Sequence, residues 1–244
     1  MKISEIFGPT IQGEGAAAGR HCLFVRLALC NLECTWCDTP YTWAYTPEKA
    51  AKLIVPVVYD RDENTRDMTA AMVIEELCKL WPMRIMPTMV VISGGEPLMQ
   101  QNDLIVLTAM LRQYGHDVHI ETAGTLKPST SLDDLVSQYN VSPKLAHSGN
   151  VESKRIKPEV LKFFAGNYKA WFKFVIKTTL DLVEIEQLVK EYYIRPSRVM
   201  VMPEGVTIDD NINVARDVVD EAIKLGFGLT FRSHILLWKD VRGK

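Results

Sequence analysis

Short apolar runs alternate along the chain with longer segments in which apolar residues recur every three to four positions. The short runs are rich in β-branched residues, which is typical of buried strands, and the longer segments have the spacing of amphipathic helices. The pattern predicts strands at residues 21–29, 89–92, 118–121, 171–176, 199–202 and 227–231, and one more entering Ser142. It predicts helices at residues 69–81, 102–114, 132–138, 180–193 and 209–225, the first with Thr69 as its N-cap.

Strands that alternate with helices predict an α/β fold with a parallel sheet. About six βα units are present, fewer than the eight of a closed barrel, so we expect a partial, open βα barrel. No linker rich in Gly, Ser or Pro divides the chain, and we predict one domain over residues 1–244. An irregular insertion is expected at about residues 46–67, and a polar loop at residues 147–154.

The composition narrows the choice of partner and location. The net charge is −2, so no basic excess points to nucleic acid, and a small molecule is the better expectation. No uninterrupted apolar run reaches the roughly 18 residues of a membrane span. The N-terminus has no long apolar core after a basic start, so it does not have the pattern of a signal peptide. We therefore expect a cytoplasmic protein without a membrane segment.

Three of the five cysteines lie within eight positions, at Cys30, Cys34 and Cys37, directly after a predicted strand. An odd count argues against a disulfide framework and favours thiolates that bind a metal centre. Three thiolates could hold an iron–sulfur cluster with one iron left open, or a zinc ion completed by a histidine such as His21 or His147. The spacing alone leaves both alternatives open. The other two cysteines are expected to pack as small apolar groups, namely Cys22 and Cys78.

A glycine turn, Gly94-Gly95-Glu96-Pro97, follows the predicted strand at residues 89–92. Two adjacent glycines let the backbone approach a ligand closely. By itself the turn is a weak signal, because an ordinary connection between a strand and a helix would explain it.

A second glycine turn, Gln12-Gly13-Glu14-Gly15, precedes the strand that carries Arg26. Its amide and carboxylate could bind the polar edge of a heterocycle, and the guanidinium could pair with a carboxylate through two hydrogen bonds. A tight turn and a surface ion pair would explain the same residues without a ligand.

Together these motifs resemble a known family. The spacing Cys-x3-Cys-x2-Cys, with Trp36 before the third cysteine, resembles the radical S-adenosylmethionine (SAM) superfamily, as does the Gly-Gly-Glu-Pro turn. The Gln-Gly-Glu-Gly turn, the Ser-Pro-Lys segment at residues 142–144 and the segment RSHILLW near the C-terminus are similar to the 7-carboxy-7-deazaguanine synthase family. The resemblance covers roughly residues 3–240 and is weakest over residues 46–66.

The resemblance implies a radical SAM fold, a 4Fe-4S cluster, SAM and Mg²⁺. It implies conversion of 6-carboxy-5,6,7,8-tetrahydropterin to 7-carboxy-7-deazaguanine with loss of ammonia, in the pathway of 7-deazapurines and queuosine. The cofactors carry the chemistry, so no side chain is predicted to be catalytic. An external electron donor such as flavodoxin and a homodimer are expected by the same analogy.

The resemblance also assigns roles to individual residues. Cys30, Cys34 and Cys37 would hold the cluster, and Thr39 would help to bind Mg²⁺. The residues expected to bind SAM are Trp36, Gly94, Gly95, Glu96, Thr122, Ser142 and Lys144. Those expected to bind the pterin are Gln12, Glu14, Arg26, Glu121 and His234. Two departures from the family are Ala123, where an Asn is frequent, and the tail at residues 239–244, to which we assign no role in the site.

Two other functions stay open at this stage. An activase that makes a glycyl radical on a partner protein would share the cysteine and Gly-Gly-Glu-Pro motifs. A metal-binding module without turnover would share the cysteines alone. SAM binding would exclude the module, and a protein substrate would favour the activase.

Overall fold

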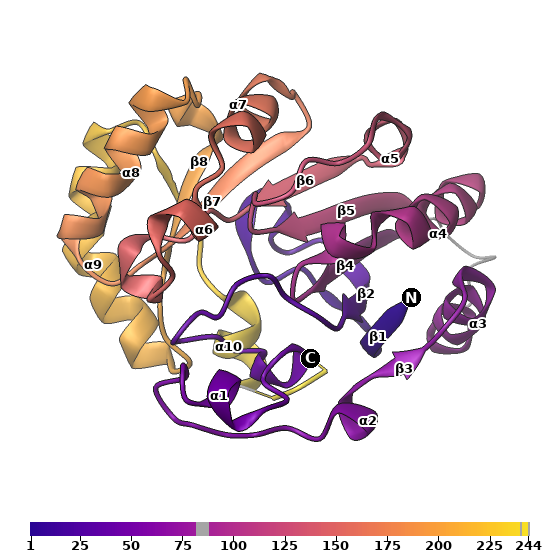
Figure 1. Cartoon of the computed structure of the whole chain (residues 1–244). Helices are drawn as coiled ribbons and strands as arrows, with labels where there is room; N and C mark the ends of the chain where they lie inside the picture. Colours follow the sequence, from indigo (N-terminus) through magenta and orange to yellow (C-terminus); the bar gives the residue numbers. More distant parts are fainter. Residues whose placement is uncertain (82–87, 240, 244) are drawn as a thin grey trace.

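The computed structural model describes residues 1–81, 88–239 and 241–243, which form an α/β fold around one mixed sheet (Figure 1). The strand order in the described part of the chain is β3-β1-β2-β4-β5-β6-β7-β8-β9. The two outermost strands, β3 and β9, do not pair with each other, so the sheet is open. The predicted open βα barrel is confirmed.

Seven consecutive strands in this order run parallel to one another. They are β2 (His21–Leu27), β4 (Met89–Gly94), β5 (Asp117–Thr122), β6 (Gln138–Val141), β7 (Ala170–Ile176), β8 (Val199–Pro203) and β9 (Gly228–Leu229). Helices connect them along the outside of the curved sheet, as Figure 1 shows. The main ones are α3 (Ala70–Leu80), α4 (Gln101–Gln113), α5 (Thr130–Leu135), α7 (Pro158–Gly166), α8 (Thr179–Glu191) and α9 (Ile208–Lys224).

The edge before β2 differs from the prediction of an all-parallel sheet. β1 (Lys2–Ile11) runs antiparallel to β2, and β3 (Arg66–Asp67) runs antiparallel to β1. The sequence pattern did not predict β1, because its pairing with β2 shifts register at two places, one of them between Phe7 and Thr10. Such irregularities break the alternation by which a half-buried strand is predicted.

Three further segments differ in detail from the prediction. The helix expected at residues 132–138 ends at Leu135, because Val136 adopts an extended backbone and Gln138 already begins β6. The polar loop at residues 147–154 contains the start of a short helix, α6 (Glu152–Arg155). The segment RSHILLW contains a helix that the pattern did not predict, α10 (Ser233–Trp238).

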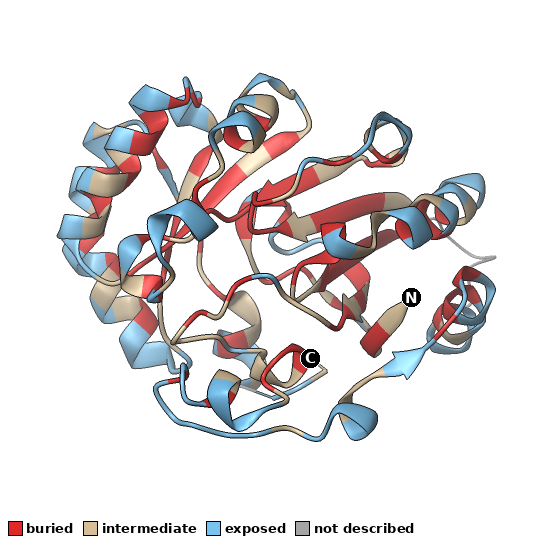
Figure 2. Ribbon diagram, viewed as in Figure 1, coloured by how far each residue is buried: buried red, intermediate tan, exposed pale blue. Residues whose placement is uncertain are grey.

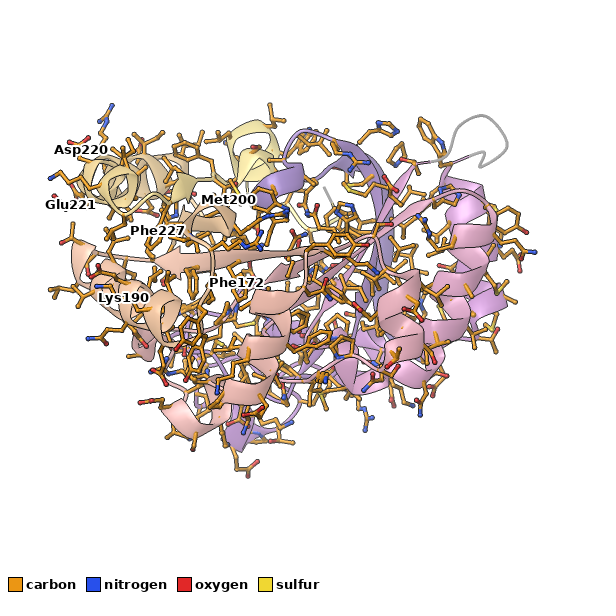
Figure 3. The ribbon with its side chains drawn as sticks, turned by 90° about the horizontal axis from the view of Figure 1, so that it is seen from above. Phe172, Lys190, Met200, Asp220, Glu221 and Phe227 are labelled. Carbon is orange, nitrogen blue, oxygen red and sulfur yellow. The ribbon has the colours of Figure 1, made fainter. Side chains whose placement is uncertain are left out.

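The buried residues lie mainly between the sheet and the helices that cover it (Figure 2). Figure 2 shows buried residues along the strands and on the inner faces of the helices. Phe172 on β7 and Phe227 belong to the main core, whereas Lys190 on α8 and Glu221 on α9 are exposed (Figure 3). Cys22 is buried against Ala17, Met89 and Val91, as predicted. Cys78 is exposed on α3, so the prediction that it packs inside is wrong.

The segment at residues 46–67 contains α1 (Pro47–Ala50), α2 (Arg61–Asn64) and β3. Leu53 is buried beside Trp43, and the Ile54 N–H donates to the carbonyl of Thr35 in the cysteine loop at 2.9 Å. The segment therefore packs against the loop that carries the cysteines. After it, the Thr69 hydroxyl accepts from the Met72 N–H at 3.3 Å, which confirms Thr69 as the N-cap of α3.

None of the helices in the described residues combines the length and the apolar character that crossing a membrane requires.

The ends of β2 and β4 approach so closely that only glycine fits between them. Gly94 has a φ of +136°, and a Cβ on it would lie 2.1 Å from the carbonyl oxygen of Leu27. The Gly95 N–H donates to that same oxygen at 3.1 Å, and the Glu96 N–H donates to the carbonyl of Leu29 at 2.8 Å. This contact fixes the glycine turn beside the first residue of the cysteine loop.

We expect Gly94→Ala to lower the free energy of unfolding by at least about 3 kcal/mol, because it adds a clash to a backbone conformation that alanine avoids. Urea unfolding of the metal-free protein would measure the change. Gly166→Ala is the matched control, because no atom beyond its chain neighbours and the backbone of its own helix lies within 4 Å of a Cβ built there. A Gly94→Ala protein as stable as this control would contradict the close approach.

Candidate active site

One pocket of about 400 Å³ lies at the carboxyl ends of the parallel strands. This is the edge at which α/β folds place their ligands. Fifteen of the sixteen residues assigned to the site from the sequence line it. They are Gln12, Glu14, Arg26, Cys30, Cys34, Trp36, Cys37, Thr39, Gly94, Gly95, Glu121, Thr122, Ser142, Lys144 and His234. The structure brings them together from segments that are far apart in the sequence.

The three cysteines of the loop after β2 all line this pocket. Burial raises the pKa of each thiol, that of Cys37 to about 11, so without a metal these groups are neutral. Among the described residues, no group of three or more His, Cys, Asp and Glu side chains is arranged to hold a metal ion. An iron–sulfur cluster does not need the ligands to converge on one ion, because each thiolate binds a different iron of the cluster.

The histidines considered as zinc ligands do not complete a zinc site with the cysteines. His21 begins β2 and the cysteines follow its other end, which places roughly 20 Å of strand between them. His147 is stacked on Trp36 with the ring centroids 5.5 Å apart, and its Nε2 lies 3.1 Å from the carbonyl oxygen of Val175. The donor set at the pocket is thus three thiols, which suits an iron–sulfur cluster with an open iron.

Glu96 is the one assigned residue that does not line the pocket. Its carboxylate is buried and accepts hydrogen bonds from the Thr122 hydroxyl at 2.9 Å, the Ala123 N–H at 2.8 Å and the Leu98 N–H at 3.1 Å. Burial raises its pKa despite these donors. Glu96 therefore joins the turn after β4 to the end of β5, and it is placed to position Thr122 rather than to touch a ligand.

Aromatic and polar groups form the wall beside the cysteines. The Lys144 ammonium lies 5.5 Å from the centre of the Trp36 ring and donates to the Ser142 hydroxyl at 3.0 Å. The Ser93 hydroxyl lines the pocket and is buried, and the described residues offer it no hydrogen-bond partner. A buried hydroxyl without a partner is a position where a polar ligand would complete the hydrogen bonding.

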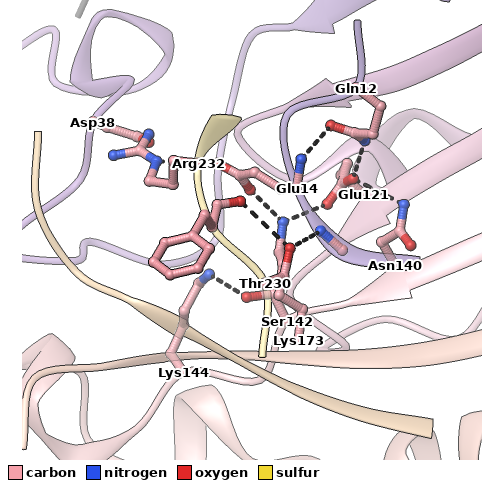
Figure 4. A network of polar contacts seen from close by, with 12 residues as sticks. Gln12, Glu14, Asp38, Glu121, Asn140, Ser142, Lys144, Lys173, Thr230 and Arg232 are labelled. Carbon is pink, nitrogen blue, oxygen red and sulfur yellow. Dashed lines mark hydrogen bonds and ion pairs between the residues drawn. The ribbon is translucent and has the colours of Figure 1, made fainter. Parts of the chain in front are cut away.

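A buried cation organises the polar floor of the pocket (Figure 4). Lys173 on β7 lies between two carboxylates, 2.5 Å from Glu14 Oε2 and 3.0 Å from Glu121 Oε2. The side-chain amides of Gln12 and Asn140 each donate to Glu121 Oε1 at 2.9 Å. The turn after β1 is thereby fastened to β5, β6 and β7.

The charges in this floor depend on one another. Burial alone would lower the pKa of Lys173, but Glu121 and Glu14 raise it well above the usual range. Burial alone would raise the pKa of Glu14, but Lys173 and Arg232 hold it well below the usual range. At neutral pH the Glu14 carboxylate is therefore ionised, and it is an acceptor for N–H groups.

The segment after β9 closes one side of the floor. Arg232 donates to Glu14 Oε1 at 3.1 Å and pairs with Asp38 in the cysteine loop. His234 lies against Gly13, where a Cβ would be only 2.1 Å from its Nδ1, and burial lowers the pKa of the imidazole. The imidazole is therefore favoured in its neutral form, which can both donate and accept a hydrogen bond.

Arg26 is paired within the protein. Its Nε donates to Glu5 Oε1 at 2.5 Å, and Glu5 also accepts from the Tyr41 hydroxyl at 2.8 Å and from Arg242 Nε at 3.0 Å. The Arg242 guanidinium lies 3.8 Å from the centre of the Tyr41 ring. The tail, to which we had assigned no role, thus reaches the pocket with residues 241–243, while its last residue lies outside the described residues.

Sequence reasoning missed several residues of the pocket, above all Lys173, Arg232 and Asp38. Lys173 carried a usable signal, because a lysine inside an apolar strand must find an opposite charge. Arg232 is the first residue of the segment RSHILLW, which contributed to the family resemblance but not to the assignment of Arg232 to the site. The pairing of Arg232 with Asp38 had no signal, since 194 positions separate them.

We expect Lys173→Met to reverse the pH dependence of stability. In the parent protein the lowered pKa of Glu14 contributes stability that is lost as the pH falls below about 4.5. In the variant, only Arg232 still pairs with Glu14, and the Glu121 carboxylate that shared Lys173 now repels it, so we expect the pKa of Glu14 to rise and stability to fall as the pH increases above about 4.5. Urea unfolding should show a loss of about 3–5 kcal/mol at about pH 7.5 and a smaller loss at about pH 5.

Lys190→Met is the matched control for this measurement. Lys190 pairs with Glu186 on the exposed face of α8 at 2.8 Å, so the change should stay within about 0.5 kcal/mol at both pH values. A loss for Lys173→Met that does not change with pH would show that the lysine acts through packing and not through its charge.

Similarity to known proteins agrees with the geometry of the pocket. A family model for a 4Fe-4S single cluster domain matches residues 11–157. The chain is 35% identical to the 7-carboxy-7-deazaguanine synthase of Pyrobaculum aerophilum over 100% of this chain and 97% of that protein, and 30% identical to that of Bacillus subtilis over 100% and 98%. Its fold is similar to the crystal structure of QueE from Escherichia coli, with a TM-score of 0.64 and 24% identity over 94% of this chain and 92% of that one. The chain therefore belongs to the 7-carboxy-7-deazaguanine synthase family of radical SAM enzymes.

Proposed function

We propose that this pocket converts 6-carboxy-5,6,7,8-tetrahydropterin to 7-carboxy-7-deazaguanine with loss of ammonia. The observation that carries the proposal is that one pocket unites three cysteine thiols, a floor of two carboxylates paired with Lys173, and an arginine. The thiols suit a cluster, the carboxylates suit the N–H groups of a pterin, and the arginine suits its carboxylate.

Cys30, Cys34 and Cys37 would hold the 4Fe-4S cluster and leave one iron open for SAM. With both bound, these cofactors supply the 5′-deoxyadenosyl radical that removes a hydrogen atom from the substrate. The protein's part is to bind and orient SAM and to shield the site. Residues proposed to bind SAM line the pocket beside the cysteines, namely Trp36, Gly94, Gly95, Thr122, Ser142 and Lys144.

The ionic floor would select the pyrimidine ring of the pterin. Lys173 takes one oxygen of Glu14 and one of Glu121, and each carboxylate keeps lone pairs for N–H groups of the substrate. A pyrimidine edge with an amino group and a ring N–H offers such donors. His234, favoured in its neutral form, can bond the ring without adding charge.

The carboxylate of the pterin would bind at Arg26. Glu5 occupies its Nε, and a guanidinium has further N–H groups with which to hold a carboxylate. Thr39 would supply a hydroxyl to Mg²⁺ together with substrate oxygens and water, which matches the preference of this ion for oxygen ligands. Its hydroxyl lies 3.7 Å from the sulfur of Cys37, so Mg²⁺ would be held beside the cluster.

We propose the remaining features on the family resemblance. The chain would act as a single radical SAM domain and a homodimer in the cytoplasm, and an external donor such as flavodoxin would reduce the cluster. A metal-binding module without turnover would have no use for the ionic floor. An activase would have to admit a segment of a partner protein to the radical, whereas the acceptors and the arginine of this pocket suit a small heterocycle with a carboxylate.

The direct test is anaerobic turnover. The protein is reconstituted with iron and sulfide, reduced, and given SAM and Mg²⁺ with and without 6-carboxytetrahydropterin, and the products are identified by mass spectrometry. We expect 7-carboxy-7-deazaguanine only when all components are present, and none from Cys34→Ala, which lacks one cluster ligand. Release of 5′-deoxyadenosine without this product, at saturating pterin, would overturn the proposed substrate.

We expect Arg26→Gln to lower kcat/KM for the pterin at least about tenfold, because a hydrogen-bonded ion pair with the carboxylate is lost. Slow SAM cleavage without the pterin should keep its parent rate. Arg216→Gln, at an exposed position on α9, is the matched control and should leave both rates unchanged. An equal loss of turnover and of SAM cleavage in Arg26→Gln would show that this residue does not bind the carboxylate.

A further inference from the structure

Each of the three cysteine sulfurs faces an N–H donor of the protein. The Leu32 N–H lies 3.5 Å from the sulfur of Cys30, which is an ordinary contact within one turn of the loop. The other two donors are side chains. Asn150 Nδ2 lies 3.2 Å from the sulfur of Cys34, and Trp43 Nε1 lies 3.3 Å from the sulfur of Cys37.

The orientation of Asn150 is fixed by its other contacts. Its Oδ1 accepts from the Glu33 N–H at 2.9 Å, so its amide nitrogen must point the other way, towards Cys34. The loop is also held in place, because the Thr35 N–H donates to the carbonyl of Ser148 at 3.0 Å. Gly149 has a φ of +77° and passes so close to Thr35 that a Cβ would lie 2.6 Å from its methyl carbon.

Trp43 is buried, with an exposed fraction of 2%, in a small cluster with Ala44 and Leu53 against which Cys30 and Cys37 pack. An indole can only donate, and a buried indole N–H normally has a partner. A neutral thiol is a weak acceptor, whereas a thiolate bound to iron carries charge and accepts a stronger hydrogen bond. The N–H donors around the cysteines therefore suit thiolates bound to iron better than neutral thiols.

We infer that Trp43 and Asn150 set the reduction potential of the cluster through N–H···S hydrogen bonds to Cys37 and Cys34. A reduced cluster carries one more negative charge than an oxidised one, and an N–H donor stabilises the form with more charge on sulfur. Both side chains therefore make the cluster easier to reduce. They are positioning residues that touch the ligands of the cluster, and the inference rests on the proposed cluster at Cys30, Cys34 and Cys37.

The test is a redox titration of the reconstituted full chain without SAM, read by electron paramagnetic resonance. At the potential where half of the parent cluster is reduced, we expect the ratio of reduced to oxidised cluster to fall about fivefold in Trp43→Phe, the effect of one hydrogen bond of average strength. Asn150→Asp should lower the ratio further, because it keeps the acceptor for the Glu33 N–H and replaces the donor by a negative charge.

Trp81→Phe is the matched control. This indole lies outside the pocket, and its Nε1 has no hydrogen-bond partner among the described residues, so the ratio should not change. A second readout is the coupling of the reduced cluster to exchangeable protons, measured by electron–nuclear double resonance in H2O and D2O. Trp43→Phe should lose one such coupling, and Trp81→Phe should lose none.

Iron and sulfide are counted in every sample before the titration. Clusters fully loaded in Trp43→Phe and Asn150→Asp, with the reduced fraction and proton couplings of the parent, would overturn the inference and leave the proposed function intact. If Trp43→Phe takes up no iron, Asn150→Asp decides alone. A parent protein that holds no cluster would instead overturn the proposed function.

Discussion

The pocket depends on one buried ionic interaction, that of Lys173 with Glu14 and Glu121. Three segments meet there, the turn after β1, the end of β5 and the middle of β7, and their side chains are held by one cation. Ions inside a protein are costly unless they are paired and hydrogen bonded. Here Gln12, Asn140 and Arg232 supply further hydrogen bonds to the two carboxylates at the floor of the pocket. The interaction that joins these segments therefore also places the hydrogen-bond acceptors of the pocket.

A second constraint fixes the cofactor end of the same pocket. Gly94 lets β4 approach the end of β2, and the cysteine loop leaves β2 immediately beyond this contact. The loop is then held from two sides, by the segment at residues 46–67 through Ile54 and by the turn around Gly149 through Thr35. Asn150, in the turn around Gly149, donates to the sulfur of Cys34, and Trp43, which is buried in one cluster with Leu53 of that segment, donates to the sulfur of Cys37. The surroundings of the cluster are therefore built by parts of the chain outside the cysteine motif.

The sequence predicts those elements that leave a local or periodic pattern in it. Most strands and helices of the parallel part were predicted because their apolar spacing is regular, and Thr69 because caps have a short signature. β1 was not predictable, since its pairing shifts register. Glu96 shows the limit for the site: its motif placed it at the right turn, but only the structure shows that its carboxylate is buried behind the pocket lining and accepts from the Thr122 hydroxyl. The contacts of Lys173, Arg232 and Arg242 join segments far apart in the chain, and no local pattern encodes them.

The central proposal is that Glu14 and Glu121 bind the pyrimidine edge of a pterin and that Arg26 binds the carboxylate of the same pterin. The most direct measurement is a crystal structure of the anaerobically reconstituted protein with SAM and 6-carboxytetrahydropterin. We expect N–H groups of the pyrimidine ring to bind Glu14 and Glu121, with Lys173 still between the two carboxylates, and the carboxylate of the pterin to bind Arg26. A ring bound the other way round, with its carboxylate on Lys173 and the pair with Glu14 broken, would contradict it.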